Sequence, residues 1–240
     1  EDGIRDVERS RGLGDVYKRQ DVHRPQRRAR LGGRPVQRQR AHRAQAAAGN
    51  ARILEAAGVE YVDSPVSGLK FRAEEGTLAS MTAGAKAAVE RARPLIEGYS
   101  RVLFHVGTDA GQGQRMKVVN NALCISAYVT TSEALAYGES GGLAMDTMLE
   151  VLNASSGQNF ATAQLFPKYV ATGDYDASGA DAHILEKDLG LFVDAATAEG
   201  TPNAAIARTY EIVAAFAAAD PRQDQMRIYP FVRDLSLIHI

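Results

Sequence analysis

The spacing of apolar residues alternates between helical and strand-like from Ala51 to Gly107. "ARILEAAG" has apolar residues at helical spacing and ends at Gly58, and glycine commonly terminates helices. "AKAAVERARPLIEGY" predicts a second helix, which Pro94 should bend or end. Three β-prone runs predict strands: "VEYVDSPVSG", "GTLASMTAG" and "RVLFHVG". This alternation predicts an α/β sheet, and three strands amount to the second half of a doubly wound sheet.

After Gly113 the pattern is helical throughout. "QRMKVVNNALCISAYVTTSEALAYGES" is apolar on nearly all sides, which predicts a long helix buried on most faces. Later stretches repeat the helical spacing, and we expect Asp146 and the pair Thr201–Pro202 to begin two of these helices. The predicted fold class is therefore α/β then all-α. A partial Rossmann-like half sheet, the remnant of a dinucleotide-binding domain at residues 51–110, precedes a helical substrate and oligomerisation domain at 111–233.

The two ends of the chain differ from the middle in composition. "HRPQRRARLGGRPVQRQRAHRAQ" is dense in arginine without any acidic residue, as in a disordered basic arm or a nucleic-acid-binding tail. We favour a third interpretation. "GLGDVYKRQ" and "DLSLIHI" resemble translated sequencing-adapter sequence, and the arginine-rich stretch resembles a GC-rich gene read out of frame. Residues 1–50 and 234–240 are therefore expected to be non-native or disordered, and to lie outside the fold.

Composition argues against several classes of protein. The 240 residues carry a formal charge of −1, which does not favour binding to nucleic acid or to a membrane surface. The single cysteine, Cys124, excludes an internal disulfide and an all-cysteine metal site, and the five histidines are scattered. No apolar run is long enough to span a bilayer. We therefore expect a cytoplasmic protein without a metal site, a nucleic-acid partner or a membrane partner.

The stretch "GQGQRMKVVNN" carries the strongest candidate chemistry. Lys117, Asn120 and Asn121 are three and four residues apart, so they share one face of a helix. On a buried helix these groups need polar partners or a wet cavity. They are therefore either a ligand site or a snorkelling lysine beside structural asparagines. Gly111 and Gly113 do not complete a G-x-G-x-x-G dinucleotide turn, because residue 116 is methionine, and no such turn follows any predicted strand.

Four stretches, in this order, resemble the β-hydroxyacid dehydrogenase family, which includes 3-hydroxyisobutyrate dehydrogenases and tartronate-semialdehyde reductases and is 6-phosphogluconate dehydrogenase-like. "DSPVSG" resembles the family's substrate-binding stretch, and "GTLASMTAG" resembles the strand that follows it. "GQGQRMKVVNN" resembles the catalytic helix, and "EKDLGLFVDAA" resembles the late cofactor-facing motif. The resemblance extends over residues 51–235.

The resemblance implies an enzyme that transfers a hydride between a nicotinamide cofactor, NAD or NADP, and a small β-hydroxyacid or its semialdehyde. It also implies a Rossmann domain followed by a helical domain, and a homo-oligomer. The implied site consists of Lys117 as the catalytic residue, Ser67, Gly68, Asn120 and Asn121 as substrate-binding residues, and Lys187 and Asp188 as cofactor-binding residues.

Two departures from the family pattern leave alternatives open. Leu69 and Lys70 follow Gly68, where the family usually has a second glycine, so the grip on a substrate carboxylate should differ. The phosphate-binding turn is missing, so an inactive, N-terminally damaged fragment is one outcome. An imine reductase-like enzyme is a second, although Lys117 argues mildly against it. A non-catalytic, dehydrogenase-like reader or oligomerisation module is a third.

Overall fold

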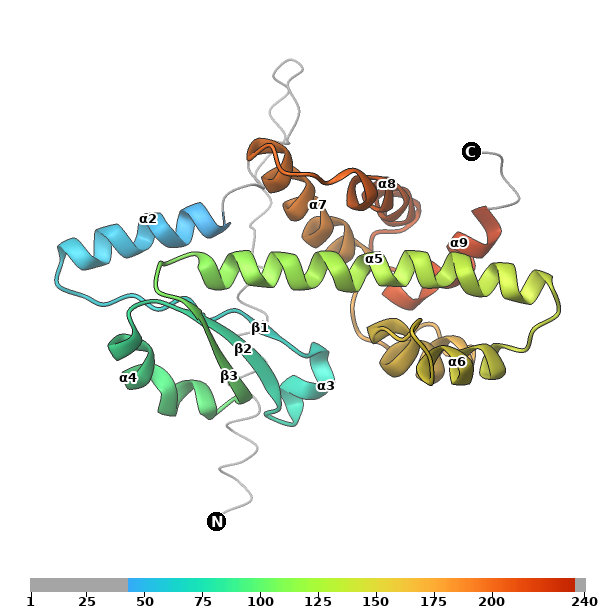
Figure 1. Ribbon diagram of the computed structural model, residues 1–240, viewed down its shortest axis with the longest axis horizontal. Helices are drawn as coiled ribbons and strands as arrows, with labels where there is room; N and C mark the ends of the chain where they lie inside the picture. Colours follow the sequence, from blue (N-terminus) through green and yellow to red (C-terminus); the bar gives the residue numbers. More distant parts are fainter. Residues whose placement is uncertain (1–42, 236–240) are drawn as a thin grey trace, which may run out of the picture.

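The computed structural model describes residues 43–235, and its first part is a small sheet with helices (Figure 1). The strands are β1 (Val66–Ser67), β2 (Leu78–Ala83) and β3 (Ser100–Gly107), in the order β1-β2-β3. β1 is antiparallel to β2, whereas β2 and β3 are parallel and connected by a crossover helix. The helices of this part are α2 (Arg43–Ala56), α3 (Leu69–Glu74) and α4 (Lys86–Glu97). α2 crosses the boundary that we predicted at residue 50.

The rest of the described chain is helical, which confirms the predicted fold class. α5 (Gln112–Ser140) is 29 residues long and runs horizontally through the middle of Figure 1, from above the sheet to beyond α6. It contacts β2, β3 and α2 of the first part as well as α6, α7, α8, α9 and η2 of the second. The elements that follow it are α6 (Met145–Asn153), the π-helix η2 (Ala161–Val170), α7 (Ala182–Ala198), α8 (Ala204–Ala219), the short 3₁₀-helix η3 (Gln225–Arg227) and α9 (Ile228–Leu235).

Two features of the sheet region differ from the simplest interpretation of the sequence. Pro94, which we expected to bend or end its helix, does not end α4, which continues to Glu97. Pro94 lies in the last turn and is exposed, so water can solvate the carbonyl group that loses its helical donor. The first predicted strand is reduced to β1 and an isolated bridge between Asp63 and Ala83, because Pro65 between them has no N–H to donate.

Two predicted helix starts were wrong. Asp146 lies in the first turn of α6, and Ala144 occupies the N-cap position. Thr201 closes α7 and does not open α8, because its backbone N–H and its hydroxyl group both donate to the carbonyl oxygen of Ala196, at 2.9 and 3.2 Å. α8 begins three residues later, with Asn203 as its N-cap.

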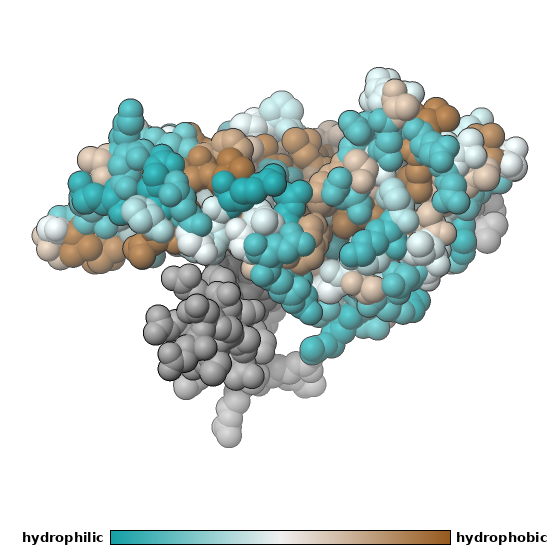
Figure 2. Space-filling view, turned by 90° about the horizontal axis from the view of Figure 1, so that it is seen from below, coloured by the Kyte–Doolittle hydropathy of each residue, from teal (hydrophilic) through white to brown (hydrophobic). Residues whose placement is uncertain are grey.

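The main hydrophobic core lies among the helices of the second part. Phe166, Phe216 and Tyr229 are among its largest fully buried side chains, and the rings of Phe166 and Tyr229 meet edge to face. α5 contributes one side of this core and is not buried on most faces, contrary to our prediction. Its Leu123 is 65% exposed and its Tyr137 is 83% exposed. Figure 2 shows hydrophobic residues among hydrophilic ones on the face seen from below.

The two parts meet where Asp63 caps the first turn of α5. The Asp63 carboxylate is buried and accepts hydrogen bonds from the backbone N–H groups of Gly111, at 3.0 Å, and Gln114, at 2.9 Å. These groups have no partner within the helix, so a carboxylate at this position also complements the helix dipole. A Cβ atom on Gly113 would lie 2.5 Å from the carbonyl oxygen of Met81. Gly113 therefore allows α5 to pack directly against β2.

Replacing Asp63 with alanine should lower the free energy of unfolding by about 2–4 kcal/mol, because two backbone N–H groups at the start of α5 lose their acceptor. Urea denaturation followed by circular dichroism measures this change. Asp174→Ala, at an exposed loop position, is the control and should change stability by less than about 0.5 kcal/mol. Equal stabilities of the two variants would show that the cap does not hold the parts together.

Candidate active site

A cavity of about 430 Å³ lies at the start of α5, between the segment that precedes β1 and the first half of α7. Lys117 and Asn121 line it from α5, and Lys187 and Asp188 line it from α7. Tyr61 lines it from the segment before β1, two residues before the Asp63 cap. Four of the seven predicted site residues therefore come together in one cavity, although two of them are about seventy positions along the chain from the other two.

A continuous chain of polar contacts joins the cavity to β1. Asn121 donates through Nδ2 to the Asp188 carboxylate at 2.8 Å and accepts at Oδ1 from Asn120 Nδ2 at 3.2 Å. Asn120 Nδ2 also donates to the hydroxyl oxygen of Ser67 at 3.4 Å. At the other end, Lys187 Nζ lies 3.3 Å from Asp188 Oδ1. Asn120 and Ser67 do not line the cavity but support, through this chain, the residues that do.

The remaining predicted residue, Gly68, has a structural reason to be glycine. Its φ is +152°, and a Cβ atom there would lie 2.8 Å from both Arg72 Cβ and Leu78 Cδ2. Leu69, which follows it, is the one non-glycine residue with positive φ, +60°, between residues 43 and 235. Its side chain packs against the helical core. The departure from the family's second glycine therefore introduces backbone strain next to the candidate substrate residues.

Two charged or aromatic residues of the cavity were not singled out from the sequence. Asp63 is the cap described above, and Tyr61 lies two residues before it. Partial burial and the neighbouring negative charge of Asp63 raise the pKa of the Tyr61 hydroxyl group. The sequence signal for the Asp63 cap was an acidic residue directly before a Ser-Pro turn. This signal does not reveal that the partner of Asp63 is Gly111, 48 residues away.

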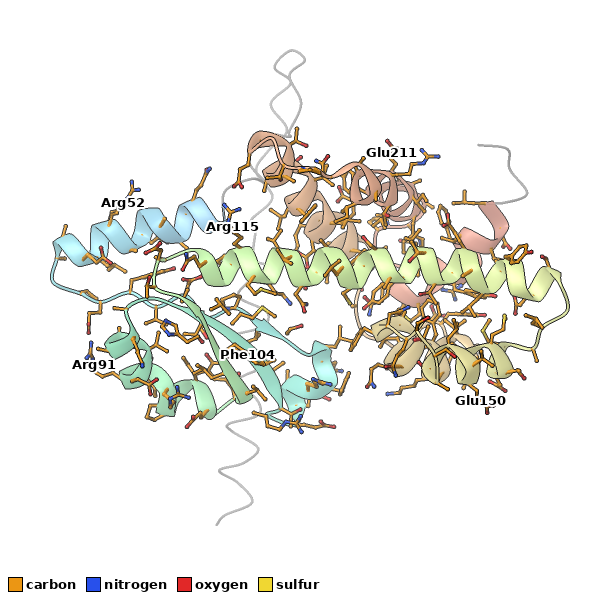
Figure 3. The ribbon with its side chains drawn as sticks, in the orientation of Figure 1. Arg52, Arg91, Phe104, Arg115, Glu150 and Glu211 are labelled. Atoms are coloured by element: carbon orange, nitrogen blue, oxygen red, sulfur yellow. The ribbon has the colours of Figure 1, made fainter. Side chains whose placement is uncertain are left out.

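A bidentate ion pair holds α7 beside α5 near the cavity. Arg115, labelled at the start of α5 in Figure 3, donates to both carboxylate oxygens of Glu199 at 2.7 and 2.6 Å. Glu199 ends α7, so the pair joins the last turn of α7 to the first turn of α5. Because both side chains are exposed, its contribution to stability is small and its main effect is on orientation.

A second hollow, of about 520 Å³, lies elsewhere and contains none of the predicted residues. It is lined by charged side chains of both signs around Asp176, Asp224 and Arg227, and Arg227 is paired with Asp176. Within residues 43–235 no group of three or more histidine, cysteine, aspartate or glutamate side chains is arranged to hold a metal ion. None of the described helices is long and apolar enough to cross a membrane.

Two sequence profiles match the chain on either side of the junction. The profile described as NAD-binding of NADP-dependent 3-hydroxyisobutyrate dehydrogenase matches residues 111–232, and the NAD binding domain of 6-phosphogluconate dehydrogenase matches residues 40–107. The chain therefore belongs to the β-hydroxyacid dehydrogenase family, which confirms the resemblance found in the sequence.

Individual relatives agree with this assignment. The chain is 36% identical over 152 residues to 2-(hydroxymethyl)glutarate dehydrogenase of Eubacterium barkeri, covering 63% of this chain and 50% of the relative. It is 38% identical over 168 residues to 3-hydroxyisobutyrate dehydrogenase of Pseudomonas aeruginosa, covering 65% of this chain and 56% of the relative. The chain thus spans about half the length of the curated relatives that it matches.

A solved structure shares the fold. The 3-hydroxyisobutyrate dehydrogenase of Mycobacterium tuberculosis, determined with L-serine, has a TM-score of 0.71 and 28% sequence identity. The match covers 80% of this chain and 66% of that chain. The half sheet and the helical part of this chain thus have the arrangement of a dehydrogenase of this family.

The single cysteine offers a test of the charge at Lys117. Burial raises the pKa of the Cys124 thiol, whereas its hydrogen bond to Tyr128 and the positive charge of Lys117 lower it. Lys117→Gln should therefore raise this pKa further and leave less thiolate at a given pH. Alkylation of Cys124 by iodoacetamide at pH 8 should slow by roughly two- to fivefold.

Lys117→Arg is the control, because it keeps the charge and should keep the alkylation rate near that of the unchanged chain. Mass spectrometry measures the rate directly, since the chain has one thiol. Equal rates in the Gln and Arg variants would show that the charge of Lys117 does not reach Cys124.

Proposed function

We propose that the protein to which this chain belongs is an NAD(P)-dependent oxidoreductase acting on a small β-hydroxyacid or its semialdehyde. One observation carries the proposal. A lysine and an asparagine on one face of α5 line a cavity whose other wall is the Lys187–Asp188 pair of α7. A cavity with a few convergent polar groups is the usual form of a small-molecule site. A non-catalytic module would have no need of this arrangement.

The chemistry expected of Lys117 is proton transfer. When a hydroxyl group is oxidised to a carbonyl, one proton must leave its oxygen, and an uncharged lysine amine can accept it. In the direction of reduction, the lysine ammonium gives the proton to the oxygen and stabilises the negative charge that develops there. The first turns of the rigid helix α5 hold Lys117 in place, so little reorganisation is needed.

The asparagines and Ser67 suit the remaining atoms of a hydroxyacid. Asn121 lies one helical turn after Lys117 and can orient the reacting oxygen without competing as an acid. Asn120 and Ser67 lie behind it along the hydrogen-bonded chain. We propose that the substrate carboxylate binds at the β1 end of the cavity, where Val66 lines it, next to Ser67 and Gly68.

The residues present fit the nicotinamide end of a dinucleotide, NAD or NADP. The cavity, of about 430 Å³, has room for a ring, and Lys187 and Asp188 line it from α7. The cofactor, when bound, supplies or accepts the hydride. The described half sheet contains no glycine-rich turn for the pyrophosphate, so most of the cofactor's binding energy would come from outside it.

The names of the relatives narrow the substrate class. 2-(Hydroxymethyl)glutarate, L-serine and 3-hydroxyisobutyrate occur in the names of three relatives, and each carries a primary hydroxyl group two carbons from a carboxylate carbon. They differ in the third substituent on the carbon between these groups. We therefore propose a substrate of this shape.

We propose that the protein acts in the cytoplasm. The single cysteine supports this, because a chain with one thiol gains nothing from an oxidising compartment. A nicotinamide-dependent reaction also needs the intracellular pool of that cofactor.

We also propose that two copies of the chain associate along α5. Met116, Leu123 and Tyr137 lie on one exposed seven-residue repeat of α5, with the polar Thr130 between the last two and the apolar Val119 between the first two. A seven-residue spacing of apolar residues on an exposed helix face is typical of a seam between helices. A hydrophobic stripe of this length is costly to leave in water.

Replacing Lys117 with alanine should lower kcat by about a hundredfold to ten-thousandfold, because the reaction loses its general acid and base. The measurement needs an enzyme in which this chain is joined to the first dinucleotide-binding half of a family member. 3-Hydroxyisobutyrate is the substrate, and NADH or NADPH formation is followed by absorbance. Far-ultraviolet circular dichroism should show an unchanged fold.

Lys86→Ala, at the exposed start of α4, is the control and should retain full activity. Activity that survives in Lys117→Ala would remove Lys117 from the proton-transfer step. An unmodified joined enzyme that binds NADPH but oxidises no hydroxyacid of the proposed shape would contradict the proposed function.

Replacing Leu123 with glutamate should convert an associated form of the chain into monomer, because it places a charge in the middle of the stripe. Light scattering coupled to gel filtration gives the mass. Val151→Glu changes an equally exposed apolar residue on α6, off the stripe, and should leave the mass unchanged. A monomeric unmodified chain would count against association along α5.

A further inference from the structure

Asp188, which we predicted to bind the cofactor, makes a direct hydrogen bond to Asn121, which we predicted to bind the substrate. Its Oδ2 atom accepts the hydrogen bond from Asn121 Nδ2 at 2.8 Å, the shortest contact in the polar chain described above. Its Oδ1 atom lies 3.3 Å from Lys187 Nζ. The side chain is 17% exposed, so the carboxylate is mostly enclosed by these partners.

We propose that Asp188 is a positioning residue that fixes which end of the Asn121 amide faces the cavity. The inference rests on the proposed function for what Asn121 then binds, but the orientation itself does not depend on it. Asp188 would thus act on the substrate through Asn121.

The hydrogen bonds of Asn121 with Asp188 and with Asn120 define one orientation of the Asn121 side-chain amide. A carboxylate is an acceptor only, so the group of Asn121 that faces it has to be the NH₂ group. The amide oxygen of Asn121 then faces Asn120, whose Nδ2 group donates to it at 3.2 Å. Among the hydrogen bonds of the described residues, this leaves the second N–H of Asn121 for a ligand in the cavity.

The orientation matters because the two ends of an amide have opposite hydrogen-bonding character. An N–H group directed at the reacting oxygen stabilises a carbonyl or a developing alkoxide. An amide turned by 180° would present a lone pair to the same oxygen and repel it. The two orientations have nearly the same shape, so packing alone cannot select between them. A fixed negative charge can, because a hydrogen bond to a charged acceptor is stronger than one to a neutral acceptor.

Lys187 has a supporting part in this arrangement. It lies beside Asp188, and its positive charge offsets the cost of enclosing the carboxylate. The same pair therefore keeps a carboxylate near Lys117 and Asn121 without leaving a net charge in the wall formed by α7.

The test uses the chain labelled with ¹⁵N-asparagine, whose six asparagines include Asn153 and Asn159 as internal references. Their side-chain amides donate to Thr162 and Thr131, away from the cavity. In Asp188→Asn the Asn121 side-chain resonances should move upfield and exchange with solvent at least about tenfold faster, with the two reference amides unchanged. Asp188→Glu keeps the charge and should restore part of the effect. Asp194→Asn, on the same helix, should change nothing at Asn121.

Unchanged Asn121 resonances in Asp188→Asn would overturn the proposal. A uniform change of all asparagine signals would also overturn it, since Asp188 would then merely hold α7 in place. Titration of the joined enzyme described above with 3-hydroxyisobutyrate separates this result from the proposed function. We expect about tenfold weaker binding in its Asp188→Asn variant than in the unmodified joined enzyme. If neither the unmodified joined enzyme nor its Asp188→Asn variant binds 3-hydroxyisobutyrate, the proposed function is contradicted. The Asn121 resonances would still decide whether Asp188 orients the amide.

Discussion

The contact between the Asp63 carboxylate and the first turn of α5 is the interaction on which the rest of the structure depends. It joins a loop of the sheet region to the helix that crosses the molecule, and it does so with two backbone donors that the helix itself cannot satisfy. The cap sets where α5 begins. The start of α5, together with the helical repeat, sets the direction in which Lys117 and Asn121 point. The shape of the cavity therefore depends on the hydrogen bonds between the Asp63 carboxylate and the first turn of α5.

The four predicted site residues that line the cavity lie on packed helices, whereas a loop before β1 lines the rest of it. α5 provides the lysine and the asparagines, α7 provides the Lys187–Asp188 pair, and the exposed Arg115–Glu199 pair sets how the two helices lie together. A side chain on a packed helix moves less than one on a loop, and proton transfer is sensitive to small displacements. Helix packing and side-chain hydrogen bonds thus contribute to the same result, which is a site whose groups are in place before a ligand arrives.

Much of this could be predicted from the sequence, and the parts that could not have physical reasons. β2, β3 and α5 follow from local apolar spacing, and the shared face of Lys117 and Asn121 follows from helical geometry. The Asp63 cap and the Asn121–Asp188 bond join residues 48 and 67 positions apart, and no local pattern encodes such a pair. The effects of Pro94 and Thr201 depend on what lies beside each residue, which is solvent for Pro94 and the Ala196 carbonyl group for Thr201.

The first turns of α5 contribute to both the polar site and the exposed stripe, which limits how the sequence of this helix can change during evolution. Over two turns the helix presents Lys117, Asn120 and Asn121 to the polar site, whereas Met116, Val119 and Leu123 lie on the exposed stripe. Most positions of these turns are therefore committed to one surface or the other, and insertion of a single residue would rotate both by about 100° at once. Divergence within the family should accordingly accumulate in the loops and in α6, while the first turns of α5 admit few substitutions that do not impair one of the two surfaces.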